Sequence, residues 1–140
     1  MNKKGFTLIE LLAVIVVLGI IMAIAGNAIL KTKKDANEKE VESIYNMIKK
    51  LGPDVYLSEK DSINDDKVYF GTTYLTNKGY LKTKAIKNPS GGGNCSVYLL
   101  IDKSTTDMFD AYVNCPGLES FGTNPEEEAS GYKPYSESSE

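Results

Sequence analysis

The 140-residue chain contains no histidine, no tryptophan and no arginine, and only two cysteines. The absence of histidine excludes Ser-His-Asp and Cys-His catalysis, together with most zinc sites. The absence of arginine removes the guanidinium fork that binds phosphates and carboxylates in a bidentate manner. A net charge of −3 argues further against nucleic acid as a specific partner. We therefore expect a protein that is not an enzyme and that has no catalytic residue, metal site or cofactor.

A long apolar run near the N-terminus is the most prominent feature that is present. Residues 11–30 have Asn27 as their one strongly polar interruption. A helix of this length rises about 30 Å, which is the thickness of a bilayer core. The run is too long for the apolar region of a secretory signal, and no small-residue cleavage site follows it. The pattern predicts a transmembrane helix that is retained in the protein.

The same helix is predicted to continue beyond the apolar run as an amphipathic segment. Apolar side chains recur there at spacings of three and four residues, the periodicity of one helix face. They are Val41, Ile44, Tyr45, Ile48 and Leu51. The pair Gly52-Pro53 predicts the helix end, because glycine suits the position after a helix and proline cannot continue one. The whole helix would then contain about 45 residues, more than ordinary globular helices.

Two runs of alternating side chains, residues 95–102 and 108–115, predict an antiparallel β-hairpin. Centring its turn on Thr105 gives the hairpin one wholly apolar face, which we expect to pack on the helix stripe. The cross-strand pairs on this face are Val97 with Val113, Leu99 with Ala111, and Ile101 with Phe109. The same register places Cys95 opposite Cys115, at a separation that a disulfide bridges. We therefore expect this disulfide and an oxidising compartment.

The N-terminal residues resemble a known processing signal. Lys3-Lys4-Gly5 precedes Phe6-Thr7-Leu8-Ile9-Glu10-Leu11-Leu12. This stretch resembles the class III signal of type IV prepilins and pseudopilins, in which a basic leader ends in glycine before Phe-Thr-Leu-(Ile/Val)-Glu and an apolar helix. The resemblance implies an α+β fold shaped like a ladle. In that fold a long N-terminal helix packs at its C-terminal half on a small antiparallel β-sheet.

The resemblance also implies roles for individual residues. A prepilin peptidase would cut between Gly5 and Phe6 and methylate the new Phe6 amine. Glu10 would be the assembly residue, its carboxylate meeting the Phe6 amine of a neighbouring subunit, which relieves the cost of burying either charge alone. The Phe6 amine of the same chain is an alternative partner for Glu10. Gly19 and Ala23 are small residues four apart, a spacing that allows helices to pack closely.

The predicted organisation has five parts. They are a leader (1–5), the transmembrane and assembly half of the helix (6–30), its amphipathic half (31–52), a globular head (53–120) and an acidic tail (121–140). The tail is rich in Ser, Pro and Gly, so most of it is expected to be mobile. Within the head, we expect a short helix closed by Gly79 and a glycine-rich loop.

The orientation of the precursor is predicted from two opposing signals. Lysines on the C-terminal side of the apolar run favour a cytoplasmic head by the positive-inside rule. The cysteine pair favours an extracellular head, and large following domains are translocated largely regardless of charge. We expect a cytoplasmic N-terminus and an extracellular head, followed by a place in a surface pilus or pseudopilus. The implied partners are the same or related pilins, the peptidase, an assembly ATPase, a membrane platform protein and, before assembly, lipid.

Two other functions remain open at the level of sequence. A membrane-tethered binding or adhesin module would use the same head without polymerising. A tethered enzyme is disfavoured, since histidine and nucleophile motifs are lacking. Among pilin-like proteins, the sequence does not distinguish a major pilin from a minor pilin or from a secretion or competence pseudopilin.

Overall fold

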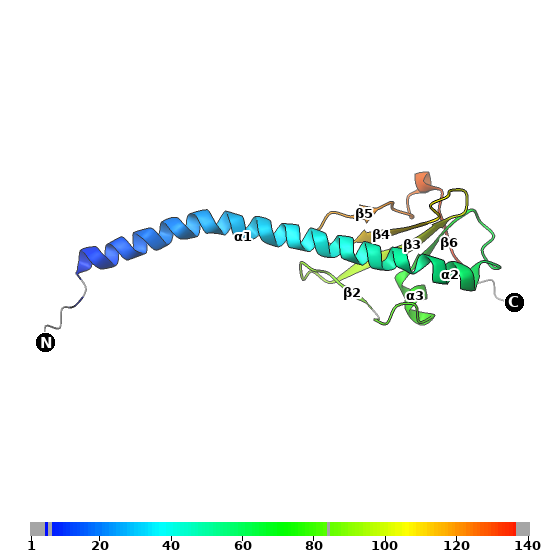
Figure 1. Ribbon diagram of the computed structural model, residues 1–140, viewed down its shortest axis with the longest axis horizontal. Coiled ribbons are helices and arrows are strands. Elements are labelled where there is room, and N and C mark those ends of the chain that lie inside the picture. The colour runs from blue at the N-terminus through cyan, green and yellow to red at the C-terminus, as the bar shows by residue number, and fades with distance from the viewer. Residues whose placement is uncertain (1–4, 6, 84, 137–140) are drawn as a thin grey trace. The chain divides into compact units, whose positions relative to one another are not determined.

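The computed structural model describes residues 5, 7–83 and 85–136 (Figure 1). The chain divides into two compact units, Met1–Ala36 and Asn37–Glu140. Helix α1 (Leu8–Lys50) begins in the first unit and ends in the second. The predicted long helix is therefore present, and it continues without interruption through Gly26 and Asn27.

The second unit contains two short helices in addition to the end of α1. Helix α2 (Gly52–Glu59) begins almost where α1 ends, with Leu51 between them. Helix α3 (Thr72–Asn77) lies close to the predicted position. Gly79 ends α3 at a φ of 82°. The Tyr80 N–H donates to the Leu75 carbonyl and the Gly79 N–H to the Thr76 carbonyl, at 2.9 Å and 3.1 Å, which is a Schellman motif.

The role predicted for Gly52 was wrong, although α1 does end before it. Gly52 is the first residue of α2, and Pro53 occupies the first turn of that helix, where its missing N–H costs no hydrogen bond. Glycine is needed here because of a neighbour: a Cβ on Gly52 would lie 2.6 Å from the ring of Phe109. The chain therefore changes from one helix to the next instead of leaving helical structure.

We expect Gly52→Ala to destabilise the second unit by about 1–3 kcal/mol, because the Phe109 ring must move from a packed position. Thermal unfolding of the full chain in detergent micelles, followed by near-ultraviolet circular dichroism, measures this. The matched control is Gly92→Ala, where the added Cβ meets its nearest neighbour at 3.5 Å. A Gly52 variant that is as stable as the control would show that the contact is not restrictive.

The sheet of the second unit has the strand order β5-β4-β3-β1-β6, with β2 paired to β3 beside this path. The strands are β1 (Lys67–Gly71), β2 (Ile86–Lys87), β3 (Asn94–Asp102), β4 (Phe109–Asn114), β5 (Phe121–Gly122) and β6 (Lys133–Pro134). Neighbouring strands are antiparallel except β1 and β6, which are parallel. The α+β fold with a small, mainly antiparallel sheet is thus confirmed.

The predicted hairpin register is confirmed. β3 and β4 pair Val97 with Val113, Leu99 with Ala111, and Ile101 with Phe109. The side chains of this face join one hydrophobic core with Val41 and Ile48 of α1. Ile44, Tyr45 and Leu51 of the predicted stripe pack against the same core. The amphipathic end of α1 is therefore the helix that covers this face of the sheet.

Tyr45 also connects α1 to the edge of the sheet. Its hydroxyl donates a hydrogen bond to the Asp110 carboxylate on β4, and its ring centroid lies 4.7 Å from that of Phe121 on β5. Burial, and then the nearby Asp110 carboxylate, raises the pKa of Tyr45 to about 12. The phenol is therefore neutral at physiological pH and remains a hydrogen-bond donor.

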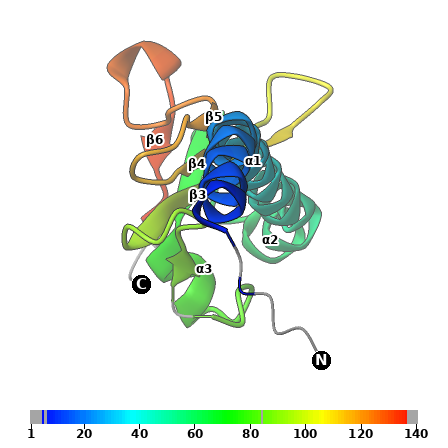
Figure 2. The same ribbon diagram turned by 90° about the vertical axis from the view of Figure 1, so that its left-hand side faces the viewer.

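The other face of the sheet is covered by the C-terminal segment, residues 123–136. Figure 2 shows this orange segment on the side of the strands opposite α2. The Tyr98 hydroxyl donates to Glu126 at 2.6 Å, and the Lys67 ammonium donates to the Ser130 carbonyl at 3.3 Å. The backbone N–H of Tyr135 donates to the Tyr69 carbonyl at 3.0 Å. Residues 121–136, which have the composition of a mobile tail, thus contain β5, a short 3-10 helix (Glu128–Ser130) and β6, and they hydrogen-bond to the sheet.

The C-terminal segment also explains why two residues on this second face of the sheet are buried. Leu100 is fully buried, and Asp102 retains 9% of its exposure. The Asp102 carboxylate accepts hydrogen bonds from the side chain and backbone N–H of Ser104, and lies 3.9 Å from the Lys67 ammonium. The Ser104 hydroxyl is the main cause that lowers the pKa of Asp102, with the backbone N–H and Lys67 adding to it against the opposing effect of burial.

The cysteines close the end of the β3–β4 hairpin. Cys95 and Cys115 form a disulfide with Cα atoms 4.2 Å apart, and both are buried. The adjoining loop is held by Asn88, whose side-chain amide donates to the Pro116 carbonyl at 2.7 Å and whose oxygen accepts from Ser90. The segment before this loop forms β2, a strand that the sequence did not predict.

Candidate processing and assembly site

In the part of the first unit that the structure describes, an apolar helix has no other element of that unit to pack against. The helix is long and apolar enough to cross a membrane, and none of its most apolar stretch is buried. Most of the large exposed apolar side chains of the described residues belong to this helix, for example Leu8 at 83% and Met22 at 74% exposure. An apolar surface this extensive requires lipid or other helices as its surroundings.

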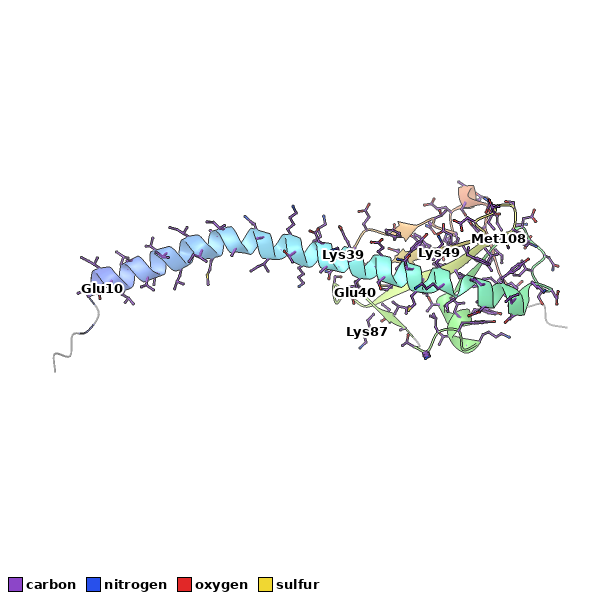
Figure 3. The ribbon with its side chains drawn as sticks, viewed as in Figure 1. Glu10, Lys39, Glu40, Lys49, Lys87 and Met108 are labelled. Atoms are coloured by element: carbon purple, nitrogen blue, oxygen red, sulfur yellow. A yellow bond between two sulfur atoms is a disulfide. The ribbon has the colours of Figure 1, made fainter. Side chains whose placement is uncertain are left out.

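Glu10 lies in the first turn of this helix, close to its N-terminal end (Figure 3). Thr7 precedes the helix, and its hydroxyl accepts a hydrogen bond from the Glu10 N–H at 3.3 Å. The Glu10 carboxylate in turn accepts one from the Thr7 N–H, also at 3.3 Å. These reciprocal bonds are a capping box, which satisfies two of the backbone donors that a helix start leaves free.

Sequence reasoning missed this cap, although the signal was present. Thr7-Leu8-Ile9-Glu10 matches the Ser/Thr-x-x-Glu pattern that precedes an apolar helix. The capping box gives Glu10 a partner within its own chain. It also uses the favourable position of a carboxylate at the positive end of the helix dipole. In the single chain Glu10 is therefore stabilised locally, by a partner other than the predicted Phe6 amine.

The predicted cleavage position lies just before the cap. Gly5 is exposed and outside the helix, and a Cβ built on it would meet no atom within 4 Å. Phe6, the predicted methylation site, lies outside the described residues. The described neighbours Gly5 and Thr7 have no regular secondary structure, so the helix begins after the predicted cleavage point.

Gly19 and Ala23, the predicted packing pair, are both exposed on α1. At about 100° per residue they lie on the side of the helix opposite Glu10. They therefore do not belong to the Glu10 site. Among the residues that the structure describes, no group of three or more His, Cys, Asp or Glu is placed to hold a metal ion.

Comparison with known proteins bears on the family of this chain. Residues 1–26 match the family model described as the prokaryotic N-terminal methylation motif. The chain is also similar to the ComG operon protein 3 homolog of Bacillus licheniformis, with 32% identity over 91 residues. The aligned region covers 65% of this chain and 87% of that relative. No solved structure matches the chain.

The methylation motif, the apolar helix and the small sheet define a pilin-like protein. The chain belongs to the type IV pilin-like family that includes the ComG operon protein 3 homolog. The family assigned from the N-terminal residues is thereby confirmed.

Proposed function

We propose that the protein is a structural subunit of a type IV pilus or pseudopilus, cleaved after Gly5, methylated at Phe6 and assembled through its N-terminal helix. The observation that carries the proposal is the combination of a methylation motif with an apolar helix whose first turn contains Glu10. The helix first resides in the membrane and then moves into a bundle of like helices. Both environments bury its exposed apolar side chains.

Assembly transfers Glu10 from a local cap to an intermolecular ion pair. The carboxylate is held near the helix start by the Thr7 N–H, at the end of the chain where cleavage frees the Phe6 amine. An amine of a second copy brings a full positive charge, which interacts with the carboxylate more strongly than a neutral N–H does. A subunit in the correct register therefore gains an ion pair, whereas a misplaced one retains only its cap.

Processing, membrane insertion and assembly each require partners. They are identical or related pilins, the prepilin peptidase, an assembly ATPase, a platform protein in the membrane, and lipid before assembly. The precursor crosses the membrane once, with its N-terminus in the cytoplasm and the second unit outside. Outside, the disulfide between Cys95 and Cys115 forms in an oxidising environment.

Mass spectrometry of filaments sheared from cells tests the proposal. We expect the chain to begin at N-methylated Phe6 and to be an abundant component of the filaments. The matched variant is Gly5→Leu, in which the peptidase meets a large side chain at the exposed cleavage position. It should leave uncut precursor in the membrane and no chain in the sheared fraction.

A mature chain that retains residues 1–5 would contradict the filament proposal. A correctly folded, membrane-bound chain that is absent from sheared filaments would instead support the tethered binding module. These outcomes are read from the same two fractions, the membrane and the sheared material.

A further inference from the structure

We infer that Lys31 and Asp35 form a second intermolecular ion pair, between adjacent copies of this chain, at the outer end of the apolar helix. The inference rests on the proposed function and deepens it. It assigns the contact that keeps neighbouring helices in the same axial register along the whole apolar segment, and not only at Glu10.

The first argument is axial spacing. Glu10 follows Phe6 by four residues, and Asp35 follows Lys31 by four residues. If the mature neighbour extends its helix to Phe6 and its amine is level with Glu10, every residue of that neighbour is level with the residue four positions later in this chain. The neighbour's Lys31 is then level with Asp35. In both pairs the positive group belongs to the same copy, so one displacement of about 6 Å satisfies them together.

The second argument is the helix face. Glu10 and Asp35 are 25 residues apart, which is about 6.9 turns at 3.6 residues per turn. They therefore lie on nearly the same side of α1, within about 20° of each other. Phe6 and Lys31 are also 25 residues apart in the sequence, so the same relation holds for a mature neighbour whose helix extends to its first residue. A neighbour whose N-terminus meets Glu10 consequently has its Lys31 on the side that meets Asp35.

The third argument is availability. Both side chains are exposed, and no ion pair joins them within the part of α1 that the structure describes. An intrachain pair is disfavoured by its direction, since a lysine four residues before an acid is the weaker arrangement on a helix. Lys31 directly follows Leu30, the last residue of the apolar run. The pair therefore lies where the packed helices begin to meet water, and the flexible lysine stem tolerates several ångströms of mismatch.

Lys33 provides the matched control. It lies two residues after Lys31, about 200° around the helix, and so faces away from the proposed contact. Lys33→Glu changes the net charge and the charge next to the membrane by the same amount as Lys31→Glu. Any effect of charge on membrane topology or expression is therefore shared by the two variants.

The experiment measures, in cells making the full chain, the fraction of mature subunit that appears in sheared filaments. We expect Lys31→Glu and Asp35→Lys each to lower this fraction about fivefold, and the double exchange K31E/D35K to return it to within about twofold of the wild type. Lys33→Glu should change it by less than about twofold. A double exchange no better than the single variants, or a Lys33 variant as defective as the Lys31 variant, would overturn the inference.

Cross-linking gives a second readout that does not depend on the charges. Cells producing a Lys31→Cys chain together with an Asp35→Cys chain should yield filaments with a disulfide-linked dimer, and Lys33→Cys with Asp35→Cys should not. Equal cross-linking in both cases also overturns the inference. Wild-type filaments containing methylated Phe6, with no effect of these variants, would leave the proposed function intact. Absence of the wild-type chain from filaments would contradict both the proposed function and this inference.

Discussion

Replacing Glu10 with glutamine is expected to lower the yield of sheared filaments roughly a hundredfold or more. Removing one partner of a buried ion pair leaves the other charge uncompensated, which costs about 3–5 kcal/mol. Glutamine retains an acceptor oxygen and also occurs at the third position of capping boxes. The variant therefore removes the charge of Glu10 while keeping the hydrogen bond with Thr7. Quantitative mass spectrometry of filaments, relative to total mature subunit, measures the effect.

The control removes the cap and keeps the charge. Thr7→Val replaces the hydroxyl that accepts from the Glu10 N–H. Loss of an N-cap costs about 1 kcal/mol, so filament yield should fall no more than about fivefold. Normal filaments from the Glu10→Gln variant would show that the intermolecular pair is not needed. An equal defect in the two variants would show that helix capping, and not charge, is the role of this site.

Removing the disulfide is expected to destabilise the second unit by about 3 kcal/mol, in the chain-entropy account of a cross-link across a loop of this length. The bridge joins residues 20 apart. We propose the double variant Cys95→Ala with Cys115→Ala, which leaves no single thiol to form unwanted bridges. Urea unfolding of the full chain in detergent micelles measures the free energy of unfolding.

Tyrosine signals restrict this measurement to the second unit. All nine tyrosines lie between Tyr45 and Tyr135, so near-ultraviolet circular dichroism is insensitive to the apolar helix. A reducing agent should destabilise the wild type by a similar amount and leave the double variant unchanged. If the reduced wild type is as stable as the oxidised protein, the hairpin register alone holds β3 and β4 together and the expected contribution is wrong.

Several features were predictable because they depend on short-range patterns. The position of α1 follows from an apolar run and then from a period of three and four residues, and both patterns are local. The pairing of Val97 with Val113 follows from alternation, since a slip of one residue would turn every side chain to the other face. Thr7 and Glu10 are also close in sequence. Their capping box was available to a reading of the sequence and was overlooked.

Other features were decided only by tertiary structure, because their partners are distant in the chain. Glycine is required at position 52 because the ring of Phe109 lies where a Cβ would be. The local sequence does not show this contact and suggested only a simple helix end. Glu126 belongs to a segment with the composition of a mobile tail, yet the hydroxyl of Tyr98 on β3 holds it against the sheet. Composition gives the apolar content of a segment, but whether the segment packs depends on distant groups, here including the core against which Tyr135 packs.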